Sequence, residues 1–263
     1  MRIALGIEYD GTRFSGWQRQ AHAINIQDHV EQALSKVADQ PIQVICAGRT
    51  DAGVHATAQV VHFDTGAERA LRSWVFGTNS NLPSDIAVQW AQPVADDFHA
   101  RFSARRRAYR FVILNRPVRP SFLLNRVLWD FRQLDAAKMA DGARHLVGQH
   151  DFSSFRGIQC QARHAVREIY HLSVRRDGQL LYIDVEANAF LHHMVRNIVG
   201  VLLEVGVGRQ PAEWVREVLR QRDRNSHRGT TVPPHGLYLT RVDYPAEWGI
   251  PSSAPPILAV DSV

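Results

Sequence analysis

The sequence predicts an α+β fold made of two ferredoxin-like halves whose antiparallel sheets are joined side by side. Strand and helix signals follow the order strand, helix, strand, strand, helix, strand over residues 1–103, which is the split βαβ arrangement of ferredoxin-like domains. A similar alternation begins near Ala104. The chain has 263 residues, 45% of them hydrophobic, and is long enough for two such halves. We therefore expect halves at residues 1–103 and 104–247 and a loosely ordered, proline-containing tail at 248–263.

In the first half, apolar residues at helical spacing predict two helices. The first follows the candidate N-cap Asn25, and the second must end before Leu82-Pro83, because a proline disfavours helix in the residue before it. Their apolar positions are Val30, Ala33, Leu34 and Val37 in the first helix and Leu71, Trp74, Val75 and Thr78 in the second. Strands are expected at residues 3–9, 41–46, 59–63 and 86–94.

In the second half, Asp177-Gly178 is the strongest turn signal, and it predicts a β-hairpin between residues 166–175 and 180–187. A helix is expected to start at Asp135, and the longest apolar helix is expected over residues 190–205. The remaining strands of this half are predicted at residues 109–114 and 127–131.

The loop after the predicted strand 41–46 places a carboxylate, Asp51, between two glycines. Gly48 and Gly53 permit the tight backbone that would lift Asp51 away from the sheet end, which is how a reactive side chain is displayed. An aspartate beside glycine can also be a solvated loop residue that bonds its own backbone. Arg49, two residues earlier, would face the same side as Asp51 in an extended segment, and His55 follows as a candidate acid-base or loop-capping residue.

Residues 47–56 closely resemble the catalytic-aspartate motif of the tRNA pseudouridine synthase A family. Further segments resemble the family in the same order along nearly the whole chain: residues 9–18, 98–104, 109–111, 190–200 and 236–239. The resemblance implies the pseudouridine synthase fold, with two RNA-recognition-like halves per subunit, in a homodimer whose joint surface grips tRNA. The implied substrate is the anticodon arm of tRNA, at uridines 38, 39 and 40.

The implied reaction breaks the N1–C1′ bond of uridine, turns the base and joins C5 to C1′, without net redox change and without a cofactor. An ionised Asp51 could supply the nucleophile or base. Three routes stay open: attack at C1′, addition at C6, and removal of the C2′ proton to give a glycal. Loss of the C5 proton ends each route, and Tyr109 or a water could accept it.

The resemblance assigns further roles to residues of the second half. Arg196 would pair with Asp51 and keep it ionised, although Arg196, Gly200 and Glu204 could equally form a stripe that faces water. Tyr109 would stack on the target uracil, where a core tyrosine is the default interpretation of a strand position. Leu237 would line the apolar wall of the pocket, and Arg49 of the first half would hold the extruded nucleotide.

Composition fits a polyanionic partner. The formal net charge is +5, and 29 of the 31 basic residues are arginines, whose planar guanidinium groups bind phosphate bidentately. A GC-rich genome would produce the same bias. The arginines cluster beside Tyr109, and we expect Arg105, Arg106, Arg107 and Arg110 to bind RNA, unless the run is only a solvated face.

Other classes of function are weaker interpretations. The two cysteines, Cys46 and Cys160, form no disulfide framework and no cysteine zinc site, and a reduced, cytoplasmic location without membrane segments is expected. No metal site is expected, because the 13 histidines lack metal-binding spacing and His192 and His193 would diverge on a helix. An aspartic protease is not indicated, because Ala52 replaces the hydroxyl residue of the Asp-Thr/Ser-Gly motif and the sequence holds no second copy of that motif.

The serious alternative is a non-catalytic tRNA-binding protein. A binder needs cations and aromatic residues but has no reason to place an anion such as Asp51 in a phosphate-facing cleft. The chain departs from the family at residues 229–234, where Gly-Thr-Thr-Val-Pro-Pro replaces an expected alanine-rich stretch, so the rim of the pocket is expected to differ.

Overall fold

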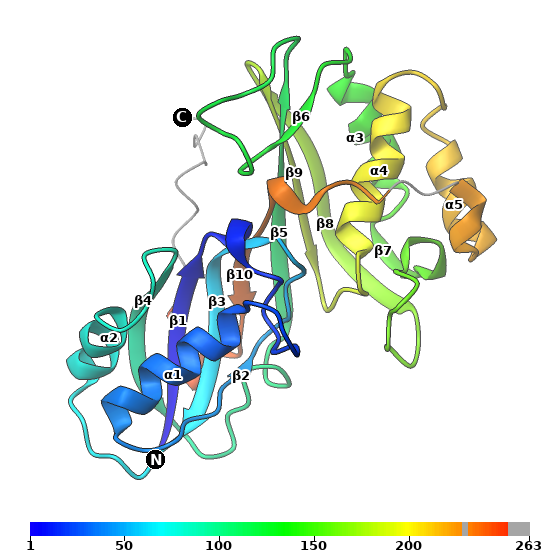
Figure 1. Cartoon of the computed structure of the whole chain (residues 1–263). Helices are drawn as coiled ribbons and strands as arrows, with labels where there is room; N and C mark the ends of the chain where they lie inside the picture. Colours follow the sequence, from blue (N-terminus) through cyan, green and yellow to red (C-terminus); the bar gives the residue numbers. More distant parts are fainter. Residues whose placement is uncertain (228–230, 252–263) are drawn as a thin grey trace. The chain divides into compact units, whose positions relative to one another are not determined.

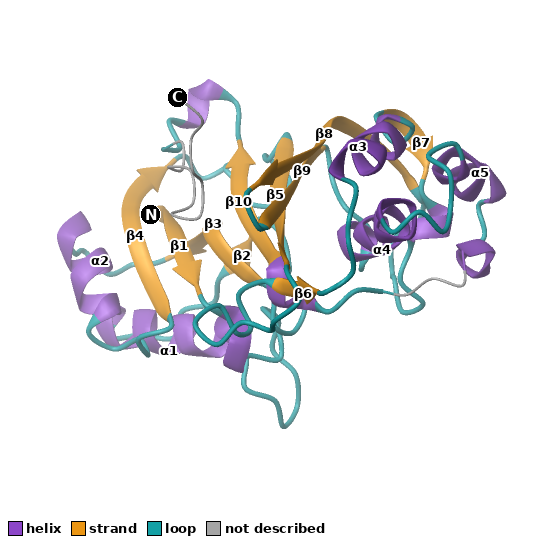
Figure 2. Ribbon diagram, turned by 90° about the horizontal axis from the view of Figure 1, so that it is seen from above, coloured by secondary structure: helices purple, strands orange, loops and turns teal. Residues whose placement is uncertain are grey.

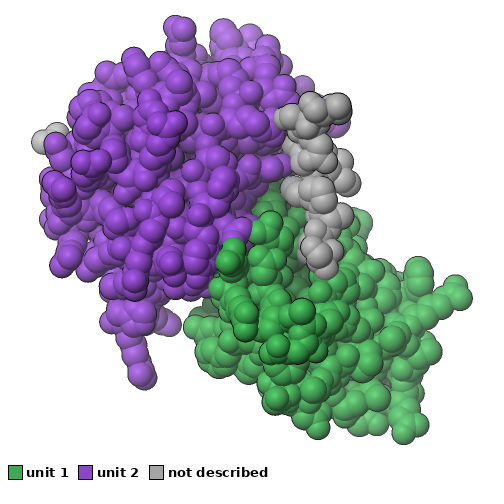
Figure 3. Space-filling view, turned by 180° about the vertical axis from the view of Figure 1, so that it is seen from behind, with its two compact units in different colours: residues 1–107, 238–263 green, residues 108–237 purple. Residues whose placement is uncertain are grey.

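The computed structural model describes residues 1–227 and 231–251 and separates into two compact units. Unit 1 comprises residues 1–107 together with the chain from 238 onward, and unit 2 comprises residues 108–237 (Figure 3). These bounds divide the chain at other points than the predicted segments 1–103, 104–247 and 248–263. The last strand of the chain belongs mainly to unit 1, although it follows the whole of unit 2 in sequence.

Unit 1 contains the predicted split βαβ arrangement. The strands β4, β1, β3 and β2 lie in this order, each antiparallel to its neighbour, and β10 runs parallel to the start of β3 (Figure 1). The helices α1 and α2 pack against each other and lie on one side of the sheet (Figure 2). The elements are β1 (Arg2–Tyr9), α1 (Ile26–Ala38), β2 (Ile45–Cys46), β3 (His55–Asp64), α2 (Leu71–Asn79), β4 (Ile86–Val94) and β10 (Leu237–Asp243).

Helix α1 begins where the sequence predicts. The side chain of Asn25 accepts a hydrogen bond from the backbone N–H of Asp28 at 2.9 Å, which satisfies one of the N–H groups that a helix start leaves open. Val30 and Leu34 bury the apolar face of the helix, and burying one such side chain stabilises the fold by about 1.5–3 kcal/mol.

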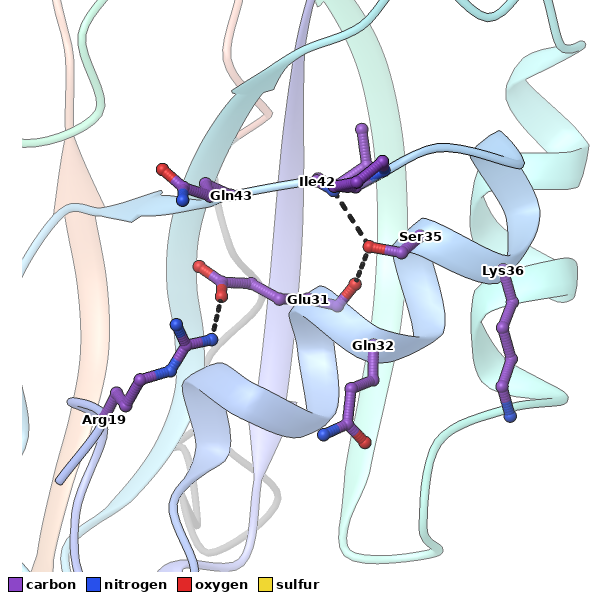
Figure 4. A pocket seen from close by; sticks show the side chains of 8 residues that line it. Arg19, Glu31, Gln32, Ser35, Lys36, Ile42 and Gln43 are labelled. Atoms are coloured by element: carbon purple, nitrogen blue, oxygen red, sulfur yellow. Dashed lines mark hydrogen bonds and ion pairs between the residues drawn. The ribbon is translucent and has the colours of Figure 1, made fainter. Parts of the chain in front are cut away.

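The predicted strand 41–46 is wrong in length, since only Ile45 and Cys46 form β2. Side chains of α1 take the backbone N–H groups that a neighbouring strand would otherwise bind. Ser35 Oγ accepts from the N–H of Ile42 at 2.9 Å, and Glu31 Oε1 accepts from the N–H of Val44 at 2.9 Å (the first is drawn in Figure 4). The buried Glu31 is also paired with Arg19, at 2.6 Å.

These contacts border a surface hollow of about 560 Å³ between α1 and residues 41–43 (Figure 4). Its lining is Arg19, Glu31, Gln32, Ser35, Lys36, Pro41, Ile42 and Gln43. None of these is a predicted site residue.

Unit 2 contains the remaining strands, which pair with mixed directions, and its own helices. The strand order is β5, β9, β8, β7, with β6 parallel to β5, and α3 packs against β8, α4 and α5 (Figure 1). The predicted hairpin is confirmed as β8 and β9, with Gly178 at the turn. The elements are β5 (Arg106–Asn115), β6 (Leu128–Asp130), α3 (Ala136–Arg144), β7 (Gly148–Asp151), β8 (Val166–Asp177), β9 (Leu180–Ala187), α4 (Met194–Gly206) and α5 (Trp214–Gln221).

The long apolar helix starts later than predicted. It begins at Met194, and the residues from 190 to 193 form the approach to it, because His193 has a left-handed backbone with φ of 62°. His192 and His193 therefore do not diverge along a helix, and their rings lie 3.8 Å apart. Within the described ranges, no helix is long and apolar enough to cross a bilayer.

The predicted tail begins at a packed residue. The ring of Trp248 lies edge-on to the buried ring of Phe98, with 5.3 Å between the ring centres, and the carbonyl of Trp248 accepts from Gln92 at 3.1 Å. Residues 252–263 of this tail, and residues 229 and 230 of the predicted family departure, lie outside the described residues.

Candidate active site

The loop that carries Asp51 packs against the opening loop of the chain, which lies within residues 9–18, in unit 1. Asp51 is half-buried between β2 and β3. The carbonyl of Thr50 accepts from the N–H of Trp17 at 3.0 Å, and the N–H of Gly53 donates to the carbonyl of Phe14 at 3.2 Å. Two backbone hydrogen bonds, one on either side of Asp51, therefore fix the loop to residues 14–17.

Two glycines allow this close approach. A Cβ at Gly16, whose φ is 102°, would lie 2.8 Å from the carbonyl oxygen of Thr50. A Cβ at Gly11 would lie 2.0 Å from the carbonyl oxygen of Val54. The family-like segment 9–18 thus needs its glycines in order to pack against the Asp51 loop.

A buried polar network supports the same loop from below. Tyr9 on β1 places its hydroxyl 2.8 Å from Thr50 Oγ1, and Gln59 on β3 donates to that tyrosine oxygen at 3.3 Å. Gln59 also donates to the carbonyl of Gly48 at 2.7 Å. The sequence predicts no role for these residues, although Tyr9 lies in the family-like segment 9–18. A polar side chain at an inward strand position is the signal that points to them.

His55 also connects the Asp51 loop to the opening loop. Its buried ring stacks on Tyr238, with 4.7 Å between ring centres. Nδ1 accepts from the N–H of Gly11 at 3.1 Å and lies 3.2 Å from a carboxylate oxygen of Asp10. Of the two roles that the sequence leaves open, this geometry favours the loop-positioning one.

Arg49 is exposed at the base of the Asp51 loop. It lies close enough to Cys46 for its charge to act on the thiol, and so does Arg101. Burial raises the pKa of Cys46 to about 12, and the two guanidinium groups oppose that rise.

In unit 2, Tyr109 on β5 is buried and meets Phe190 edge-to-face, with 5.0 Å between ring centres. Such a contact orients the tyrosine ring. Phe190 lies in the family-like segment 190–200, and sequence reasoning gave it no role of its own.

Arg196 is half-buried on α4, and its Nε donates to the carbonyl of Val232 at 2.8 Å. The next residue, Asn197, is buried; it donates to the carbonyl of Phe155 and accepts from the hydroxyl of Thr231, both at 2.7 Å. Arg224 donates to the same hydroxyl at 3.1 Å. Thr231 therefore makes contacts that an alanine could not, which gives the described part of the family departure a structural role.

Leu237 is buried at the start of β10, directly after Gly236. A Cβ at Gly236 would lie 2.3 Å from the carbonyl oxygen of Val112 on β5, so a glycine is needed there for the chain to reach β5. Leu237 and Tyr109 are thereby anchored through the same strand.

The four predicted RNA-binding arginines differ in their surroundings. Arg105 and Arg106 are exposed. Arg110 forms a bidentate ion pair with Asp184 on β9, at 2.6 and 3.0 Å. Arg107 donates to three carbonyl oxygens of unit 1, including that of Ala47 at 3.0 Å, so it ties residues 101–104 to the base of the Asp51 loop.

Comparison with known proteins identifies the family of this chain. A family model described as tRNA pseudouridine synthase matches residues 6–103 and 143–245. Proteins named tRNA pseudouridine synthase A are 55% identical to this chain in Pseudomonas aeruginosa (95% of this chain and 88% of that protein) and in Nitrosococcus oceani (98% and 99%). A solved chain of an H/ACA RNP bound to a substrate RNA containing 2′-deoxyuridine covers 76% of this chain and 44% of its own length, at 13% identity and a TM-score of 0.32. The chain belongs to the tRNA pseudouridine synthase family.

Proposed function

We propose that this enzyme converts uridines 38, 39 and 40 of the tRNA anticodon arm to pseudouridine, with Asp51 as its catalytic carboxylate. Membership of the family makes the chain an isomerase that acts on tRNA. The observation that carries the assignment of Asp51 is its loop, which the opening loop, Tyr9 and Gln59 hold in one conformation. A catalytic group must be held by its surroundings in this way, whereas a solvated loop aspartate need not be.

The proposed roles follow the chemistry of the reaction. Asp51 acts on the flipped-out nucleotide as the N1–C1′ bond breaks, and C5 then bonds to C1′ and loses its proton, while the freed N1 takes up a proton. Arg196 supplies positive charge to the reacting centre, and Tyr109 stacks on the uracil and accepts or relays the C5 proton. Leu237 closes the apolar side of the pocket, and Arg49 holds the extruded nucleotide. Arg105 and Arg106, which are exposed, contact phosphates. No cofactor takes part.

Tritium release from C5-labelled uridine in tRNA transcripts tests this proposal. The native protein should release tritium, and the Asp51→Asn variant should bind the same tRNA without releasing it. Asp97→Asn, at an exposed aspartate of unit 1, is the matched control and should keep full activity. If the native protein bound tRNA but released no tritium, the non-catalytic binding function would replace the proposed one.

Mapping the product by primer extension after carbodiimide treatment tests the positions. Stops at 38, 39 and 40 in a tRNA that carries uridine at all three would support the proposed breadth. A stop at only one of them would contradict it.

We further propose a cytoplasmic homodimer. The location follows from the tRNA substrate. Unit 2 exposes large apolar side chains within one segment, residues 118–131, and Phe122 is 91% exposed. Exposed apolar surface of this kind marks protein interfaces. Light scattering should give twice the chain mass for the native protein, and the mass of one chain for Phe122→Glu; a monomeric native protein would refute the dimer.

A further inference from the structure

The segment from Phe98 to Arg107 holds an aromatic ring out in solvent. Phe102 is 75% exposed, although Phe98 and Ala100 in the same turn are fully buried. The segment contains His99 and four arginines and has no acidic residue. The proposed reaction gives Phe102 no role.

The backbone around Phe102 is fixed at successive residues by side chains from other parts of unit 1. On the N-terminal side, the carbonyl of Phe98 accepts from Arg2 at 2.8 Å. Ala100 is held twice: its N–H donates to His62 Nδ1 at 3.1 Å, and its carbonyl accepts from the Tyr244 hydroxyl at 2.6 Å.

On the C-terminal side, Arg107 donates to the carbonyl of Arg101 at 2.6 Å and to the carbonyl of Ala104 at 3.2 Å. His99 Nδ1 lies 3.2 Å from the N–H groups of Arg101 and of Phe102 itself. Phe102 is therefore presented by a rigid turn, so its exposure does not come from a loose loop.

The ring of Phe102 already lies close to two neighbouring side chains. His99 lies 4.3 Å from it between ring centres, with 33° between the ring planes, and the guanidinium of Arg101 lies 5.4 Å from its centre. Exposed aromatic rings flanked by arginines are the usual platform for unpaired bases, because every base has a face that can stack and every nucleotide carries a phosphate.

We propose that Phe102 is a stacking platform for an unpaired base of the tRNA, with Arg101 as its phosphate contact. This inference rests on the proposed function for the identity of the RNA. One side chain relates the platform to the Asp51 loop within unit 1. Arg107 donates hydrogen bonds to the carbonyls of both Arg101 and Ala47. Phe102 is thus a substrate-positioning residue that adds affinity without touching the reacting atoms. The four arginines of the segment favour RNA over a protein partner.

The test compares Phe102→Ala, Phe102→Trp and the native protein in their affinity for the tRNA substrate at fixed salt. Loss of one stacked base should weaken binding by about 5- to 150-fold, and tryptophan should restore it. KM should rise in the alanine variant while kcat stays within a factor of about two. Arg101→Ala should lower the salt dependence of binding by about one counterion.

Helix α2 offers a matched control. Phe76 is 60% exposed and also has an arginine beside its ring, Arg72, at 5.3 Å. Phe76→Ala removes an equivalent exposed pair from the same unit and should leave tRNA binding unchanged.

Native affinity in Phe102→Ala would overturn the inference, and so would an equal loss in Phe76→Ala. A change in the oligomeric mass of Phe102→Ala would also overturn it, by showing that the ring contacts protein. These failures would leave pseudouridine formation by the native protein intact. Conversely, a native protein that binds tRNA through Phe102 but releases no tritium would refute only the proposed activity.

Discussion

The hydroxyl of Tyr9 lies 2.8 Å from the hydroxyl of Thr50, the residue directly before Asp51. Both side chains are buried. The contact therefore fixes the loop that bears the proposed catalytic carboxylate to β1, a central strand of unit 1. A buried hydrogen bond of this kind is costly to break, because the polar group that remains has no water molecule to bond in place of its lost partner.

Tyr9→Phe removes one hydroxyl and leaves Thr50 and Gln59 with one buried partner fewer. We expect a free energy of unfolding lower by about 1–2 kcal/mol, and a kcat for pseudouridine formation lower by roughly tenfold, with little change in KM for tRNA. Chemical denaturation and tritium release measure the two effects. Tyr170→Phe, on an exposed part of β8, is the control and should change neither. Native kcat in Tyr9→Phe would show that the contact does not position Asp51.

Gly16→Ala should disrupt the packing of the opening loop against the Asp51 loop. The new Cβ would meet the carbonyl oxygen of Thr50 at 2.8 Å, at a φ of 102° that L-residues rarely adopt. We expect a loss of more than about 1 kcal/mol in unfolding free energy, together with a fall in kcat.

Gly178→Ala separates the effect of the positive φ from the effect of the steric clash. Gly178 also has a positive φ, of 54°, but no heavy atom lies within 4 Å of the position that a Cβ would take there. It should lose about 1 kcal/mol or less and keep full activity. If both variants were equally active, the close approach at Gly16 would have no catalytic importance.

His62 should make the protein less stable in mild acid. Burial lowers its pKa to about 4, helped by the charge of Arg2 and by His99, and its Nδ1 accepts the N–H of Ala100. An unfolded chain takes up a proton at this residue near pH 6.5, whereas the folded chain does not until about pH 4. The stability is therefore fully present above pH 6.5 and is lost as the pH falls toward 4, by up to about 3 kcal/mol.

Urea denaturation at pH 7 and pH 5 checks this expectation. His62→Gln should show a smaller loss of stability over this interval than the native protein, and His22→Gln, at an exposed histidine, should show the native loss. The carboxyl pKa of Asp64 is lowered by its hydrogen bonds from Arg2, so Asp64 acts below this window. Equal pH dependence in His62→Gln and the native protein would refute the assignment.

The sequence predicts most elements of the fold because their causes are local. Helix α1 is specified by its Asn25 cap and its apolar spacing, and the β8–β9 hairpin by Asp177-Gly178. The length of β2 could not be predicted, because the partners of its preceding backbone N–H groups are side chains 7 and 13 residues away. The start of α4 was missed because a left-handed histidine at 193 follows no composition rule.

The candidate site shows the same limit. Asp51 stands out through its glycine pattern, but the supports of its loop come from Tyr9, 41 residues before Thr50. The partner of Arg110 is Asp184, 74 residues away. The sequence therefore predicts the same RNA-binding role for four arginines whose surroundings differ in the structure. Long-range side-chain partners decide which charges remain for a ligand, and short sequence windows do not contain them.

The way in which α1 takes up the N–H groups of Ile42 and Val44 also bears on how copies of this protein behave at high concentration. The run Ile42-Gln43-Val44-Ile45-Cys46 is rich in β-branched residues, and its N–H groups would otherwise offer a template for strand addition by another chain. With two of those groups held by a serine and a glutamate, the run presents an incomplete template. Helix α1 thus protects an aggregation-prone segment, and the segment itself contains no charged residue and no proline.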